Sequence, residues 1–123
     1  MNITGVIEEL KKKYPGKKIL LNSRQNCTEI LCEVEPTTEH SSHSIVISVI
    51  DKTEAHYHTI TQETYQVVKG VLALTVDGVK YVLNEGQTYT IKPGQIHDAV
   101  GTETWVKCSS KPGWKKGDHH LKK

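Results

Sequence analysis

The sequence predicts an all-β protein that folds as a sandwich or a closed barrel, with one short helix at its N-terminus. From about residue 19 onward, apolar and polar residues alternate in short runs rich in valine and isoleucine, and turn residues separate these runs. No second helical pattern follows. A chain of 123 residues has the size of one domain with a single core, so we expect residues 1–123 to form one domain.

The predicted helix covers residues 3–14. One face carries apolar residues at the i, i+3, i+4 and i+7 positions, namely Ile3, Val6, Ile7 and Leu10. Asn2 or Thr4 could cap the start of the helix, and Pro15 and Gly16 end it. We expect this helix to pack on the outside of the β-structure.

The predicted barrel spans about residues 19–110. Its strands are the segments 27–35, 43–51, 63–70, 71–76, 79–84, 87–91, 97–101 and 104–110. Asp77 and Gly78 predict a two-residue type I′ turn between two alternating strands. Further tight turns are expected at Gly86 and at Pro93 and Gly94. Residues 111–123 show no periodicity, so the C-terminal tail is expected to be irregular.

Charge is distributed unevenly along the chain. Residues 25–104 hold four basic and eleven acidic side chains, a net charge of −7, and the two ends hold twelve against three, a net charge of +9. The basic residues are scattered, without interleaved aromatics or a helix-turn-helix pattern, which argues against a nucleic-acid partner. We expect solvated ends packed near an acidic body.

Three further features concern the location of the protein. No segment approaches the roughly 20 apolar residues that a membrane span needs, so no membrane association is expected. The N-terminus lacks a basic start followed by an apolar stretch, which favours a cytoplasmic protein over a secreted one. Cys27, Cys32 and Cys108 are an odd number without CxxC spacing, and we expect them to be free thiols.

The histidines of the stretch "AHYHTITQETYQVVKG" suggest a metal site. His56 and His58 are two residues apart, so on a strand they point to the same side. Glu63 follows after the four-residue loop "TITQ", where the chain can turn back toward the same point. Two imidazoles and a carboxylate suit a divalent first-row metal ion. His97, at the start of a later strand, is the candidate fourth ligand.

Two stretches resemble the motifs of the cupin superfamily. "HYHTITQETYQVVKG" is similar to the first motif, whose positions are met by His56, His58, Glu63 and Gly70. "GQTYTIKPGQIH" is similar to the second motif, whose positions are met by Gly86, Pro93, Gly94 and His97. The chain departs from the family pattern at turn and support positions, where it has Ile50, Lys92 and Gly101. All four metal-ligand positions hold the expected residue types.

The resemblance implies a cupin-type jelly-roll β-barrel (a double-stranded β-helix) with the metal ligands on inner strand faces. It implies one divalent first-row transition metal, which could be Mn, Fe, Co, Ni, Cu or Zn, and it implies a homodimer. Gly70 would let its strand bend near the site. Tyr65 should point into the barrel beside the metal, where its phenol could donate to a substrate oxygen or fill space.

A metal ion held by four protein ligands has about two free positions for a small-molecule ligand. Acting as a Lewis acid, it could support isomerisation or epimerisation of a sugar, a sugar derivative or a keto acid. With Fe(II) and O₂ the same positions could support dioxygenation. An isomerase also needs a general base. The candidates are Tyr65, Glu103, His119, Asp118 and His120.

The tail "PGWKKGDHH" places an aromatic residue close to titratable ones. In one interpretation it folds over the barrel mouth, with Trp114 as a lid, accompanied by Asp118 and His120, and with a histidine reaching inward. In the other, Trp114 packs on the barrel exterior and the histidines lie in solvent. His40 and His43, among serines, are expected in a polar loop.

Three classes of function remain open from the sequence. The complete ligand set favours a metal-dependent enzyme that acts on a small polar metabolite. The alternative is a non-catalytic cupin that binds or senses a small molecule such as a carbohydrate. A storage cupin is disfavoured, because such a protein needs no intact metal site.

Overall fold

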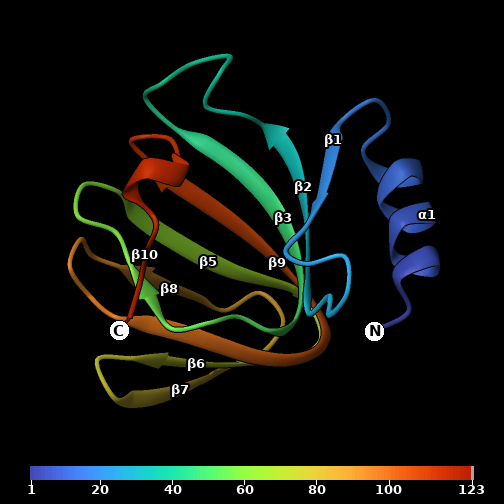
Figure 1. Cartoon of the computed structure of the whole chain (residues 1–123). Coiled ribbons are helices and arrows are strands. Elements are labelled where there is room, and N and C mark those ends of the chain that lie inside the picture. The colour runs from blue at the N-terminus through green and yellow to red at the C-terminus, as the bar shows by residue number, and fades with distance from the viewer. Residues whose placement is uncertain (123) are drawn as a thin grey trace.

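A computed structural model describes residues 1–122 as a ten-stranded sheet curled into a half-barrel, with one helix outside it (Figure 1). This confirms the predicted all-β class. The elements are α1 (Ile3–Lys13), β1 (Lys18–Leu21), β2 (Glu29–Glu35), β3 (Ser44–Lys52), β4 (His56–Tyr57), β5 (Gln62–Lys69), β6 (Leu72–Val76), β7 (Val79–Leu83), β8 (Thr88–Ile91), β9 (His97–Lys111), the 3₁₀ helix η1 (Lys116–Asp118) and β10 (His120–Leu121).

Strand β9 pairs with four other strands of the sheet. Its first part pairs with β4 and β6, and its second part lies between β3 and β5. The predicted strands 97–101 and 104–110 are therefore one strand, not two. Between them the chain bends at Gly101, where a Cβ would collide with the Thr104 side chain, and at Glu103, whose φ is +45°. Turn-like residues in the sequence thus mark a bend within a strand, which alternation alone does not distinguish from a strand end.

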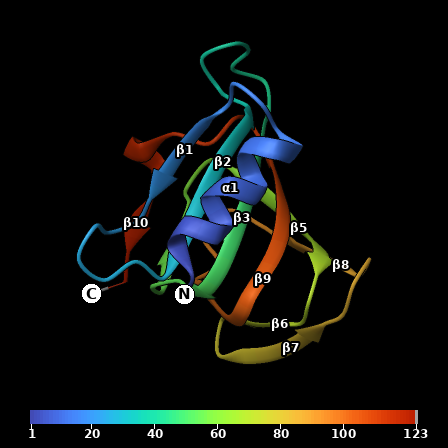
Figure 2. The same cartoon turned by 90° about the vertical axis from the view of Figure 1, so that its right-hand side faces the viewer.

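Helix α1 covers the outer face of β2 and β3, as Figure 2 shows. The Asn2 side chain accepts a hydrogen bond from the Gly5 backbone N–H at 3.2 Å, so Asn2 caps the helix. Val6 and Leu10 are buried against the sheet, together with Ile30, Cys32, Ile47, Val49 and Trp105. The helix ends at Lys13, one residue earlier than predicted.

Side-chain alternation gives β2 and β3 two different faces. On β2, Ile30 and Cys32 point to the helix, whereas Glu29, Leu31 and Glu33 line a cavity inside the half-barrel. On β3, Ile47 and Val49 likewise point to the helix, and Val46 and Ser48 line the cavity. The same two strands therefore provide the core under the helix and one wall of the interior.

The turn between β6 and β7 is the predicted type I′ hairpin. Asp77 has a φ of +48° and Gly78 a φ of +81°, and both values belong to the left-handed region that this turn needs. The predicted turn residues Gly70, Gly86 and Gly94 also have positive φ. Behind this hairpin lies the main apolar core, which includes Ile50, Tyr65, Val67, Leu72, Leu74, Val76, Ile91 and Val106.

The C-terminal tail, which was expected to be irregular over residues 111–123, holds two short elements within its described part, η1 and β10. After η1, strand β10 pairs with β4, in the register His120 with Tyr57 and Leu121 with His56. Two-residue strands are too short for a pattern to predict them. Lys123 lies outside the described residues.

The structure can be compared with the expectations for the three cysteines and for membrane-spanning segments. Cys27, Cys32 and Cys108 are free thiols, as predicted. Within residues 1–122, no helix is both long enough and apolar enough to cross a membrane.

Candidate metal centre

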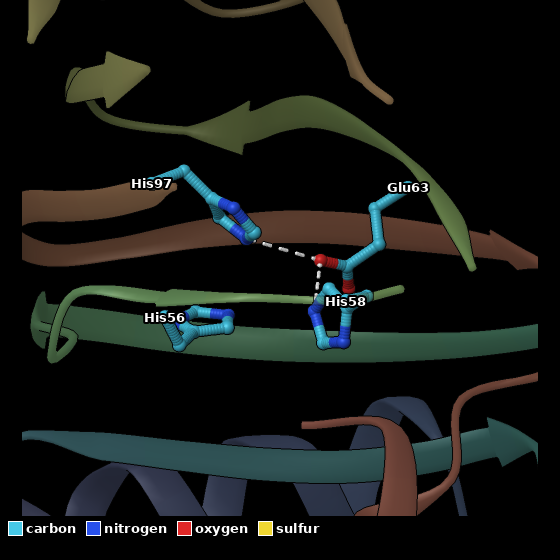
Figure 3. Close-up of side chains that lie close together, drawn as sticks. All are labelled: His56, His58, Glu63 and His97. Carbon is cyan, nitrogen blue, oxygen red and sulfur yellow. Dashed lines mark hydrogen bonds and ion pairs between the residues drawn. The ribbon is translucent and has the colours of Figure 1, made fainter. Parts of the chain in front are cut away.

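Four side chains from three strands and one loop meet inside the half-barrel (Figure 3). His56 lies on β4, His58 just after it, Glu63 on β5 and His97 at the start of β9. The side chains are almost inaccessible, because the residues are 6%, 2%, 6% and 1% exposed, respectively. One ligand atom from each lies within 4.8 Å of the other three. The four residues singled out in the sequence are therefore brought together.

The Glu63 carboxylate lies at the centre of this cluster. Its Oε1 atom is 2.9 Å from Nε2 of His58 and 3.2 Å from Nε2 of His97. The His56 ring lies beside both histidines, with centroid distances of 5.1 Å to His58 and 4.1 Å to His97. The three rings and the carboxylate thus converge on one small volume.

Each histidine is oriented through its other ring nitrogen. Nδ1 of His56 lies 2.8 Å from the carbonyl oxygen of Glu54, and Nδ1 of His97 lies 3.0 Å from that of Gln95. Nδ1 of His58 lies 2.8 Å from the carbonyl oxygen of Asp118. A carbonyl only accepts hydrogen bonds, so each Nδ1 carries the hydrogen and donates. In the neutral tautomer, every Nε2 then offers a lone pair.

The donor set fits a divalent metal ion. Neutral His58 and His97 would direct Nε2 lone pairs at the carboxylate oxygen of Glu63, and lone pairs that face each other repel. A bound cation would remove this repulsion, because the lone pairs of the imidazoles and of the carboxylate would all be directed at it. A hydrogen bond from the second ring nitrogen to a carbonyl is also the usual support of a metal-ligating histidine.

Burial and mutual charge shift the pKa values within the cluster. Burial, helped by the neighbouring His97, lowers the pKa of His56 to about 3, so this ring is neutral at physiological pH. Burial alone would lower the pKa of His58, but the Glu63 carboxylate outweighs it and raises that pKa. Burial alone would raise the pKa of Glu63, but the neighbouring imidazoles of His58 and His97 hold it well below its usual range. Glu63 is therefore a carboxylate.

A cavity of about 100 Å³ opens from the cluster into the half-barrel. Its walls are formed by Leu20, Glu29, Leu31, Glu33, Val46, Ser48, Thr53, His56, Glu63, Tyr65, Cys108, Ser110, Trp114 and His119. Tyr65 points inward, as expected, with its ring edge-on to His97 at a centroid distance of 6.1 Å. Burial and then Glu63 raise the pKa of Tyr65 well above its usual value, so its phenol keeps its proton.

The tail closes one side of this cavity. Trp114 is half-buried and is one of the residues that line it. His119 stacks on His56 at a centroid distance of 4.2 Å and also lines the cavity. His120 does not line it and stacks on Tyr57 instead. Only part of the predicted lid therefore faces the interior.

Asp118 anchors the tail to the loop after His58. Its carboxylate accepts hydrogen bonds from the Thr59 N–H and hydroxyl and from the N–H groups of Ile60 and Thr61, at 2.6–3.1 Å. Its backbone carbonyl accepts from His58. Asp118 therefore supports the cluster and lies outside the cavity wall.

Glu103 does not belong to the site. Its carboxylate accepts a hydrogen bond of 2.8 Å from the Asn2 backbone N–H, and its own N–H donates to Asp51 at 2.7 Å. It is not among the residues that line the cavity. The bend in β9 turns Glu103 toward the start of α1, so the structure does not bring this candidate general base to the cavity.

The sequence interpretation missed Glu29 and the carbonyl groups that orient the histidines. Glu29 belongs to the alternating run "CTEILCEVE", for which the sequence predicts a strand and no role in a site. A signal was available, since Glu29, Leu31 and Glu33 share one face, which the structure places in the cavity wall. Backbone carbonyls carry no sequence signal at all.

A second histidine pair lies in the loop between β2 and β3. His40 stacks on His43 at a centroid distance of 4.0 Å, and Nε2 of His43 lies 3.1 Å from Glu35. These three residues are only half-buried. The predicted polar loop is confirmed.

Comparisons with known proteins give a consistent result. The family described as "Cupin domain" matches residues 45–105. Pac13 from Streptomyces, in a variant bound to uridine, is 12% identical with a TM-score of 0.77, over 89% of this chain and 88% of that one. Pac13 is described as a nucleoside dehydratase.

Two further solved structures are similar. KdgF from a Halomonas species is 18% identical with a TM-score of 0.68, over 82% of this chain and 91% of that one. A cupin-2 domain protein from Rhodospirillum rubrum is 11% identical with a TM-score of 0.74, over 89% and 78%. At these identities the likeness shows the fold. No curated protein matches the chain.

Proposed function

The chain belongs to the cupin family, and from this premise we propose that it binds one divalent first-row transition-metal ion through His56, His58, Glu63 and His97. We further propose that it is an enzyme that isomerises or epimerises a small polar metabolite, such as a sugar, a sugar derivative or a keto acid. Mn, Fe, Co, Ni, Cu and Zn all suit this mixed set of nitrogen and oxygen ligands.

One observation carries the proposal. All three histidines donate through Nδ1 to backbone carbonyls, which leaves three Nε2 atoms and a carboxylate directed at one buried point. A bound ion would supply a Lewis acid that polarises an oxygen of the ligand. The histidine rings hold their positions without further adjustment, because the carbonyl groups fix them before any ion arrives.

The remaining cavity residues support proton transfer. Tyr65 can donate a hydrogen bond to a substrate oxygen, since its phenol stays protonated. Burial and then the neighbouring His58 lower the pKa of His119, so its imidazole is neutral and can accept a proton. Nδ1 of His119 is buried and has no hydrogen-bond partner among residues 1–122, which leaves it available to a ligand. Pac13, which shares the fold, is described as a dehydratase, and dehydration also moves protons.

Proton exchange with solvent tests the enzymatic part of the proposal. Protein loaded with each of the six metals would be mixed with small hydroxy-aldehydes, hydroxy-ketones and keto acids in D₂O and followed by proton NMR. We expect metal-dependent deuterium incorporation at the carbon next to the carbonyl, abolished by a chelator. Oxygen consumption with Fe(II) and no deuterium incorporation would instead favour dioxygenation, and ligand binding without either would favour a binding or sensing cupin.

We propose that the protein forms a homodimer through the outer face of β6, β7 and β9. Val82 and Val100 flank Ala73 on neighbouring strands, and both valines are more than half exposed. A second copy would cover this apolar row. Light scattering after size-exclusion chromatography should give twice the mass of the chain, and V82K should give the single mass. A monomeric wild type would contradict the proposal.

The three free thiols favour a reducing compartment, so we propose a cytoplasmic location.

A further inference from the structure

Strand β2 contributes two carboxylates to the cavity. Glu29, Leu31 and Glu33 alternate with residues that face the helix, so all three side chains line the interior. Glu29 and Glu33 lie on the wall that β2 and β3 form, whereas the metal ligands come from β4, β5, β9 and the loop after β4. The fold does not require acidic residues on this face, because the apolar side chain of Leu31 occupies the position between them.

Within residues 1–122, no lysine or arginine lies in the cavity wall to balance these carboxylates. The histidines in the lining are His56, which belongs to the metal cluster, and His119, which stacks on it. The wall away from the metal cluster is therefore acidic on β2 and apolar at Leu20, Leu31, Val46 and Trp114.

The setting of Glu29 in the cavity wall changes the pKa of its carboxyl group. Burial raises its pKa to about 7, a hydrogen bond with Ser48 opposes the shift, and the negative charge of Glu63 adds to it. An ionised carboxylate in such a setting is stabilised by a ligand that brings a hydrogen-bond donor or a positive charge. A second anionic group on the ligand would meet repulsion there instead.

We propose that Glu29, assisted by Glu33, selects ligands whose end remote from the metal cluster is neutral or cationic, a hydroxyl or an ammonium group. The same wall rejects ligands that carry a phosphate or a second carboxylate at that end. This rests on the proposed function, because a metal ion at the four-residue cluster must hold the other end of the ligand. Within the substrate classes named above, the inference favours free hydroxy- and amino-compounds over sugar phosphates and dicarboxylates.

The size of the cavity further limits the range of compounds that could bind. A volume of about 100 Å³ is small beside the roughly 300–1,000 Å³ of pockets that take drug-sized ligands. A compound with a three- or four-carbon skeleton suits it.

Three compounds with one skeleton test the proposal. Isoserine, glycerate and tartronate are three-carbon compounds that share an α-hydroxycarboxylate end able to chelate a metal. Their third carbon carries an ammonium group in isoserine and a hydroxyl group in glycerate, and it is itself a second carboxylate in tartronate. Isothermal titration calorimetry on the zinc-loaded protein should give the affinity order isoserine, glycerate, tartronate, with isoserine at least about 10-fold tighter than tartronate. The wild-type protein alone provides this test and needs no variant.

The variant E29Q keeps the shape of the side chain and removes its charge. We expect the isoserine-to-tartronate ratio to fall to within about 3-fold of unity in E29Q. The control E39Q makes the same change at an exposed turn residue and should keep the wild-type ratio. Circular dichroism verifies that both variants are folded.

Metal content, measured on the same samples, separates the two proposals. If zinc is bound at one ion per chain but the three compounds bind equally, or none binds, or E29Q keeps the wild-type ratio, the selection by Glu29 is wrong and the metal site stands. If no zinc is bound, the proposed function itself fails.

Discussion

Replacing His58 with alanine should lower the affinity of the protein for divalent transition metals by about 100-fold or more. Structural zinc sites with four ligands supply about 10–16 kcal/mol, so one ligand accounts for roughly 3 kcal/mol, or about two orders of magnitude in affinity. His58 is buried and its Nε2 points at the Glu63 carboxylate, so its removal takes one nitrogen donor out of the cluster. Competition against a chromophoric chelator measures the change.

His40 offers a matched control for this experiment. It is also a histidine next to a second one, but it lies in the loop between β2 and β3, outside the cluster. The variant H40A should keep the wild-type affinity at the cluster. Equal affinity of H58A and wild type, with both proteins folded by circular dichroism, would remove His58 from the ligand set.

Replacing Asp118 with alanine should destabilise the fold and weaken the metal site together. The loop after His58 would lose the acceptor of four hydrogen bonds, including one from the buried Thr61 N–H, at a cost of about 3 kcal/mol. The tail would then hold its carbonyl less firmly against Nδ1 of His58. Loss of such support usually lowers metal affinity by about 10- to 100-fold. Urea denaturation and metal titration measure the two effects.

The variant D118N separates charge from shape in this anchor. Burial alone would raise the pKa of Asp118, but hydrogen bonds from Thr59, Thr61 and Ile60 hold that pKa well below its usual range. The depressed pKa means that the carboxylate stabilises the fold above about pH 4 and that this contribution is lost as the pH falls further. The stability difference between wild type and D118N should therefore shrink in acid. A D118A protein with lower stability but unchanged metal affinity would show that the tail does not orient His58.

The sequence contained most of the information about the metal cluster. His56 and His58 follow the two-residue period of a strand, and the loop length to Glu63 and the turn before His97 fit the two family motifs. Side-chain alternation predicts that His56 and His58 point to the same side, and the resemblance to the family motifs supplied Glu63 and His97.

The parts that could not be predicted depend on contacts between distant segments. Strand β10 follows Asp118, whose carboxylate accepts hydrogen bonds from N–H groups almost 60 residues away. No local sequence pattern indicates such a contact. The exclusion of Glu103 follows from the bend in β9 and from its contact with Asn2 at the other end of the chain. Which face of β2 lines the cavity depends on where α1 packs, so Glu29 became recognisable only in three dimensions.

The metal content of the untagged wild-type protein tests the central claim most directly. The protein would be exposed in turn to Mn, Fe, Co, Ni, Cu and Zn, dialysed, and analysed by element-specific mass spectrometry. If the four-residue cluster is a metal site, at least one of these ions remains bound at one per chain. A protein that retains none of the six above background would contradict the claim.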